Sequence, residues 1–151
     1  MRAAYVDDFG PAEAIRCGVL PDPVAAAGQV VVRVEAVAVD AADTFVRSGR
    51  WGTPVSFPLV VGRDLVGTVE QVGPGVDGFQ QGQRVWTNSA GYGGRAGATA
   101  ELVAVEHDRL YPLPPGADPV QFVAALHPGA TAHGIVDGRA RVRPGETVAV
   151  V

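Results

Sequence analysis

The chain has 151 residues, of which 47 % are hydrophobic and 19 % charged, the composition of a soluble globular protein with one domain. Its net charge is −4 and its twelve basic residues, all arginine, are scattered, which leaves no electrostatic case for binding nucleic acid. The single cysteine, Cys17, excludes an intrachain disulfide and a cysteine-rich zinc site. No apolar run approaches the ~20 residues of a membrane span, and no signal peptide is recognisable, so a cytoplasmic protein is expected.

The first third of the chain alternates short strands with turns. Strands are expected over residues 2–6 and 14–20, with Cys17 as a small apolar filler in the second. The strongest strand pattern is 29–39, in which one face carries the apolar side chains Val30, Val32, Val34, Ala36 and Ala38. Residues 40–49 are typical of one or two helical turns, which Asp40 caps and a glycine ends.

A glycine-rich stretch from 60 to 86 dominates the centre of the sequence. It begins with an apolar run and the charged pair Arg63-Asp64 beside a glycine, and it continues as a strand over 65–72. The turn Gly73-Pro74-Gly75 ends that strand, because glycine supplies positive φ and proline removes a donor. The stretch therefore predicts a β-hairpin whose second strand starts near Arg84.

The remaining residues predict a loop, a strand and two helices. The loop 87–97 contains G-x-G-x-x-A at 91–96, but a strand predicted over 98–106 follows it. A dinucleotide-binding turn must open a helix, so this match is rejected. Helices are expected over 118–126 and 131–138, interrupted at Pro128-Gly129.

The central stretch reads GRDLVGTVEQVGPGVDGFQQGQRV and resembles the catalytic domain of the medium-chain dehydrogenase/reductases. The resemblance covers essentially the whole chain and favours the zinc-independent quinone oxidoreductase branch. It implies a mainly β fold, a GroES-like partly open β-barrel with a few short helices. Residues 1–145 would form this GroES-like catalytic domain, and 146–151 would be the first strand of a Rossmann nucleotide-binding domain that is absent from this chain.

By this resemblance, the complete enzyme would transfer hydride from NADPH to a quinone or an enone, and its full-length form could be a homodimer. Asp40, Arg63 and Tyr92 are the catalytic candidates, and Asp40 and Thr131 are the candidates for contact with the cofactor. The chain alone is not expected to bind NADPH tightly or to reduce quinones, because it ends before the nucleotide-binding turn. Two alternatives remain open: a stand-alone domain that binds a ligand or partner, and a domain used for cyclisation or isomerisation.

A zinc site, and purely structural roles for the candidate residues, are the remaining alternatives. The ligand positions of the zinc-dependent relatives map onto Asp40, Arg63 and His127, and arginine has no lone pair to offer a metal, so no metal is expected. Asp40 could serve only as a helix cap, and Arg63 could pair with Asp64 or Asp40 at the surface. Thr131 could be an ordinary helix-start hydroxyl.

Overall fold

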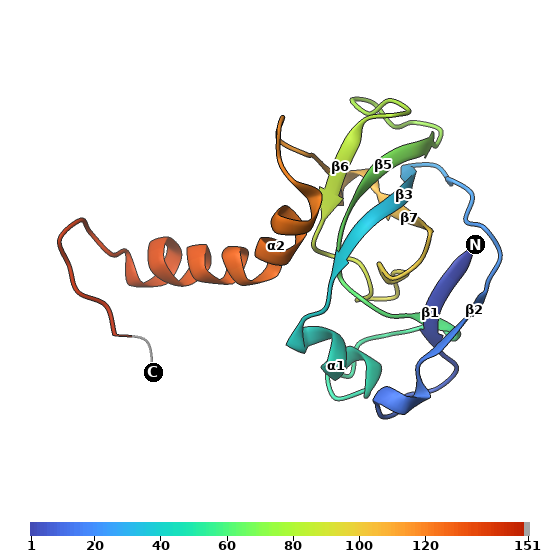
Figure 1. Cartoon of the computed structure of the whole chain (residues 1–151), viewed down its shortest axis with the longest axis horizontal. Coiled ribbons are helices and arrows are strands. Elements are labelled where there is room, and N and C mark those ends of the chain that lie inside the picture. Colours follow the sequence, from blue (N-terminus) through green and yellow to red (C-terminus); the bar gives the residue numbers. More distant parts are fainter. Residues whose placement is uncertain (150–151) are drawn as a thin grey trace.

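Strands are the commonest regular element in the computed structural model, which describes residues 1–149 (Figure 1). A three-stranded sheet has the order β2-β1-β4, formed by β1 (Arg2–Val6), β2 (Arg16–Val19) and β4 (Leu59–Val60). A five-stranded sheet has the order β7-β3-β5-β6-β8, formed by β3 (Gln29–Ala38), β5 (Asp64–Val72), β6 (Arg84–Thr87), β7 (Leu102–Glu106) and β8 (Tyr111–Pro112). An antiparallel bridge from Ala3 to Ala100 connects the two sheets. The predicted mainly β, GroES-like fold is confirmed, and the barrel is not closed.

The helices lie at the ends of this β body. Helix α1 (Ala41–Arg47) follows β3, and single 3₁₀ turns occur as η1 (Ala12–Ala14) and η2 (His107–Arg109). Helix α2 (Pro119–His133) begins against the sheet, and its second half, continued by the π-helical segment η3 (Gly134–Ala140), projects away from the β body (Figure 1). No helix within residues 1–149 has the length and apolar character needed to cross a membrane.

The predicted break at Pro128-Gly129 is wrong, because α2 continues through both residues. Proline removes one backbone hydrogen bond and leaves the carbonyl four residues earlier without its usual donor. Here Pro128 and Ala124 are both exposed, so water can reach that carbonyl and the helix continues.

A β-bulge in β3 determines which of its side chains pack into each hydrophobic core. Along its pairing with β5, β3 shifts register between Val34 and Ala36, so that Glu35 is an extra residue. Before the bulge, Val30 and Val32 point into the main core, whereas after it Val37 packs there and Ala36 packs on the opposite side, against α2. The predicted single apolar face of 29–39 is therefore divided between two cores.

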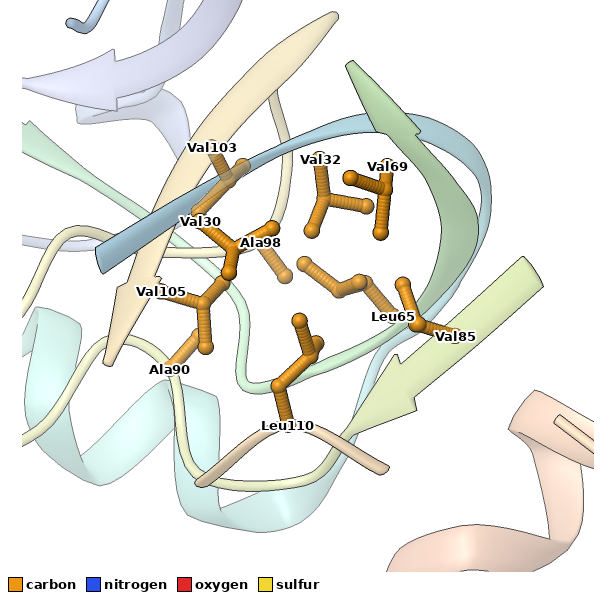
Figure 2. Close-up of a cluster of buried hydrophobic side chains, with 10 residues drawn as sticks. All are labelled: Val30, Val32, Leu65, Val69, Val85, Ala90, Ala98, Val103, Val105 and Leu110. Atoms are coloured by element: carbon orange, nitrogen blue, oxygen red, sulfur yellow. The ribbon is translucent and has the colours of Figure 1, made fainter. Parts of the chain in front are cut away.

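The main core lies between the strands of the larger sheet and the loops that cover it. Figure 2 shows its members converging from β3, β5, β6, β7 and the loops beside them: Val30, Val32, Leu65, Val69, Val85, Ala90, Ala98, Val103, Val105 and Leu110. A second cluster attaches α2 to the outer face of the same sheet through Val123 and Leu126, which pack with Val66. A third attaches α1 to the smaller sheet through Val46 and Leu59.

Several predicted strand boundaries need correction. The strand expected over 14–20 is shortened to β2 because η1 occupies its start, and Cys17 is exposed on this edge strand rather than being a buried filler. The strand expected over 98–106 begins at Leu102. The first strand of a Rossmann domain is predicted over 146–151. Residues 146–149 pair with no strand, because an isolated segment has no neighbouring strand to bond with. Residues 150–151 lie outside the described residues.

Candidate functional site

Three ionisable side chains meet where the ends of β3, β5 and α2 come together. Ala38 pairs with Asp64 across β3 and β5, which places Asp40, two residues further on, beside the start of β5. Leu126 packs in the same cluster as Val66, and this contact brings the next residue of α2, His127, to the same place. Each of Asp40, Asp64 and His127 has a nitrogen or oxygen atom within 4.8 Å of the other two.

Asp64 is the most unusual of these residues, since it is 0 % exposed and neither of its carboxylate oxygens has a hydrogen-bond partner. Burial, together with the nearby carboxylate of Asp40, raises the pKa of Asp64 to about 7. Burial also raises the pKa of Asp43 in α1. At neutral pH this corner of the domain therefore holds fewer charges than its three aspartates would carry in water.

Asp40 occupies the N-cap of α1, as predicted. Asp43, at the third helical position, accepts a hydrogen bond of 2.8 Å from the backbone amide of Asp40, as in a capping box. One oxygen of each aspartate, Oδ2 of Asp40 and Oδ1 of Asp43, is nevertheless buried without a partner. The cap thus explains why an aspartate begins the helix, and it leaves part of each carboxylate free for another role.

Arg63 directs its guanidinium toward an aromatic ring rather than a carboxylate. Its Cζ atom lies 5.4 Å from the centre of the Tyr92 ring, and Nη2 donates to the carbonyl of Asn88 over 3.3 Å. Its Nε is buried without a partner. Neither Asp40 nor Asp64 forms a salt bridge with it in the described part of the chain, so the alternative of a surface ion pair is wrong.

The glycine-rich loop that follows β6 holds Arg63 in place. The amide of Ala90 donates to the carbonyl of Arg63 over 3.1 Å, and the amide of Ala98 donates to the carbonyl of Gly62 over 2.9 Å. Any side chain at Gly97 would overlap the carbonyl of Val60, which is why only glycine fits there. The rejection of residues 91–96 as a dinucleotide-binding turn is confirmed, because this loop is followed by β7 and not by a helix.

The structure brings two of the predicted site residues into contact. Arg63 and Tyr92 are in contact, and the ring of Trp51 stands edge-on to Tyr92 at 5.8 Å. Asp40 joins Asp64 and His127 instead, although the charge of Arg63 also acts on the adjoining Asp43. Thr131 is exposed on α2, one helical turn beyond His127, and no hydrogen bond connects it to the cluster. Its role stays a prediction.

Sequence reasoning missed Asp64 as a site residue. One signal was available. Asp64 is a carboxylate at the start of a largely apolar strand, and the sequence has no basic residue placed to pair with it across the sheet. The sequence instead suggests that Asp64 is half of a local charged pair with Arg63. Asp40, Asp64 and His127 could each offer a ligand atom, but the guanidinium of Arg63 acts on the adjoining Asp43, and we assign no metal to the trio.

A separate concave feature lies elsewhere on the domain. An open groove of about 610 Å³ runs between β1, β2 and β3 and is mostly apolar, with Cys17, Val19 and Val34 among its lining residues. None of the ionisable residues of the clusters around Asp64 and Arg63 lines it. Buried unpaired polar atoms and perturbed carboxyl groups indicate chemistry more directly than volume does, so we place the candidate site at Asp40, Asp64 and Arg63.

Comparison with known proteins identifies the family of the chain. Residues 26–115 match the family model described as the alcohol dehydrogenase GroES-like domain. The chain belongs to this family. A quinone oxidoreductase from Rattus norvegicus is 35 % identical over 153 residues, which cover 99 % of this chain and 45 % of the relative. The solved structure of a mycobacterial quinone oxidoreductase superposes with a TM-score of 0.81 at 31 % identity, covering 97 % of this chain and 44 % of the other.

A further solved structure, of a mycobacterial protein complexed with NADPH, has 30 % identity and a TM-score of 0.81, covering 97 % of this chain and 44 % of the other. This GroES-like domain thus corresponds to the N-terminal part of medium-chain dehydrogenase/reductases and spans under half the length of the relatives it matches. The predicted membership of that superfamily is confirmed.

Proposed function

We propose that this domain forms the substrate side of the active site in an NADPH-dependent quinone or enone reductase. Its relatives include quinone oxidoreductases, and one similar structure holds NADPH. When bound, NADPH supplies a hydride, and the residues of this domain hold the substrate and stabilise the oxygen on which negative charge develops.

The observation that carries the proposal is the state of Arg63. A partly buried guanidinium that has no carboxylate partner, and whose Nε donor is unused, is ready to bind an anionic oxygen. The face of Tyr92 and the carbonyl of Asn88 keep this side chain oriented. An oriented, partly desolvated cation stabilises an enolate or quinol oxyanion more strongly than one in water would.

The described residues fit only one end of the cofactor. Both α-helices begin at an aspartate N-cap, Asp40 in α1 and Asp118 in α2, and a carboxylate at a helix N-terminus repels a phosphate. Asp40, and Thr131 on α2, are therefore proposed to approach the nicotinamide, and the pyrophosphate is left to residues outside 1–149.

The finer parts of the proposal are an enzyme that works without zinc, as a cytoplasmic homodimer, with Arg63, Asp40 and Tyr92 lining the substrate site. Support for the absence of zinc comes from Arg63, since a guanidinium has no lone pair for a metal. The dimer and the cellular location rest on the resemblance to quinone oxidoreductases and on the composition.

Steady-state kinetics of the complete enzyme that contains this domain test the proposal. Arg63→Ala should lower kcat/KM for quinones and enones by about 100- to 1,000-fold, the loss expected for ~2.7–4 kcal/mol of oxyanion stabilisation. Arg63→Lys should recover part of the rate, because it keeps the charge without the planar fork. Arg16→Ala, which removes an exposed arginine of β2, is the matched control.

Unchanged kinetics in Arg63→Ala would show that Arg63 has no part in the reaction. Absence of any quinone- or enone-dependent NADPH oxidation by the wild-type enzyme would contradict the proposed function and favour a binding or non-redox role.

A further inference from the structure

The carboxylates of Asp40, Asp43 and Asp64 form a cluster in which the available hydrogen bonds leave several buried oxygens without a partner. Four of their oxygens are inaccessible to solvent and have no partner: both oxygens of Asp64, Oδ2 of Asp40 and Oδ1 of Asp43. None of the three forms a salt bridge among residues 1–149, and the nearest arginine directs its guanidinium to Tyr92 and Asn88.

Such a cluster is unstable when all of its members are ionised. An ionised carboxylate with buried, unpaired oxygens loses the solvation it had in water, and the hydrogen bonds in the cluster replace only part of it. Two carboxylates that face each other add mutual repulsion. One retained proton removes both penalties, because it neutralises one group and supplies a donor for an oxygen of the other.

We propose that Asp64 and Asp40 share one proton and that, through Asp40 and His127, this pair delivers it to the oxygen of the reduced substrate. The delivery step rests on the proposed function, whereas the shared proton does not. Asp64 is 0 % exposed and cannot touch a substrate, so it holds the proton for its half-buried neighbours. Asp64 is in this sense a positioning residue that acts through Asp40 and His127.

The groups that face Asp64 come from every element packed around it. Asp40 and Asp43 approach from the start of α1, His127 approaches from α2, and Arg63 precedes Asp64 in the chain. Burial and the carboxylates of Asp40 and Asp43 favour the protonated form of Asp64, whereas the nearby backbone N–H of His127 favours its ionised form. This balance is consistent with a group that still carries a proton near neutral pH.

The chemistry balances with one proton and one hydride. The hydride brings two electrons to the quinone or to the β-carbon of the enone, and NADPH leaves as NADP⁺. The substrate oxygen or α-carbon, now electron-rich, takes the proton from the Asp64–Asp40 pair and forms the new O–H or C–H bond. The pair is left with an additional negative charge and regains a proton from water.

Carbon-detected NMR titration of the aspartate carboxyl groups in the 151-residue chain tests the shared proton directly. Asp64 should titrate near neutrality, and Asp40→Asn should move its titration to lower pH, since the neighbouring negative charge is removed. Asp77→Asn replaces an exposed aspartate and should leave the titration of Asp64 unchanged. An Asp64 that titrates in the ordinary range of about 4 would overturn the proposal.

Kinetics of the complete enzyme test the delivery. Wild-type kcat should fall as the pH rises through neutrality, and Asp64→Asn should have a kcat that is lower by about 100-fold or more at acidic pH and nearly independent of pH, the loss typical of a general acid. Asp40→Asn should have the same effect on the pH profile, and it replaces Asp64→Asn in this test if that variant folds poorly. A pH profile that is the same in wild type and both variants would overturn the delivery step.

The two measurements separate this proposal from the proposed function. A neutral titration of Asp64 in a protein without reductase activity would contradict the reductase and support the shared proton. An active reductase whose Asp64 titrates near the ordinary value of about 4 would support the proposed function and contradict the shared proton.

Discussion

Asp64 should make the folded domain less stable as the pH rises toward neutrality. Its pKa is about 7 in the folded protein and 3.8 in the unfolded reference, so the folded state binds the proton more tightly. The stabilisation that this provides is fully present below pH 3.8 and is lost as the pH rises through about 7. The interval of roughly three pH units corresponds to about 4 kcal/mol in all, of which about 2–3 kcal/mol falls between about pH 5 and pH 8.

Urea unfolding followed by tryptophan fluorescence, at about pH 5 and pH 8, measures this effect. Wild type should lose about 2–3 kcal/mol more than Asp64→Asn over this range, because asparagine has no proton to lose. Carboxylates with lowered pKa values, such as Glu35, change protonation below this window, and Asp43 is present in both proteins. Asp77→Asn is the exposed control and should behave as wild type. An equal loss in wild type and Asp64→Asn would refute the reasoning.

Three further predictions concern zinc, the cofactor and the loop after β6. Purified protein should carry no stoichiometric zinc, since Arg63 stands at a metal-ligand position of the zinc-dependent relatives; about one zinc per chain in elemental analysis, retained through mild chelation, would contradict this. Residues 1–151 alone should bind NADPH with a Kd of about millimolar or weaker in titration calorimetry, because a few contacts at the nicotinamide end do not offset the ~4 kcal/mol or more that association costs. Micromolar binding would show that the cofactor site is misplaced. Gly97→Ala should destabilise the domain by about 1–3 kcal/mol, because its Cβ would overlap the carbonyl of Val60. Gly129→Ala, at an open position in α2, should be neutral or stabilising by up to about 1 kcal/mol.

Part of the candidate site could be predicted because its residues follow local rules. Asp40 precedes a helix in the sequence and caps that helix in the structure. Tyr92 and Arg63, both predicted site residues, are 29 positions apart in the printed sequence, and they are in contact. Their contact itself could not be predicted, since it depends on hydrogen bonds between the loop after β6 and the residues just before β5.

Asp64 shows what local rules cannot reveal. In the sequence it stands beside an arginine, and an ion pair is the simplest interpretation. In the structure, Arg63 lies in the bend before β5 and Asp64 is the first residue of that strand, and the two side chains have different surroundings. Asp64 instead meets Asp40 through the register of β3 with β5, and His127 through the packing of α2 on Val66.

The sequence by itself determined the fold class, the position of most strands and the family of this protein, because strand alternation, glycine turns and helix caps depend on residues close together in the chain. Only the tertiary structure decided that β3 divides its side chains between two cores at a bulge, and that α2 continues past Pro128. It also decided that three aspartates share one corner in which four of their oxygens are buried without a hydrogen-bond partner. The pKa of a carboxyl group depends on burial and on charges brought near by folding, and neither is a property of the neighbouring residues in the sequence.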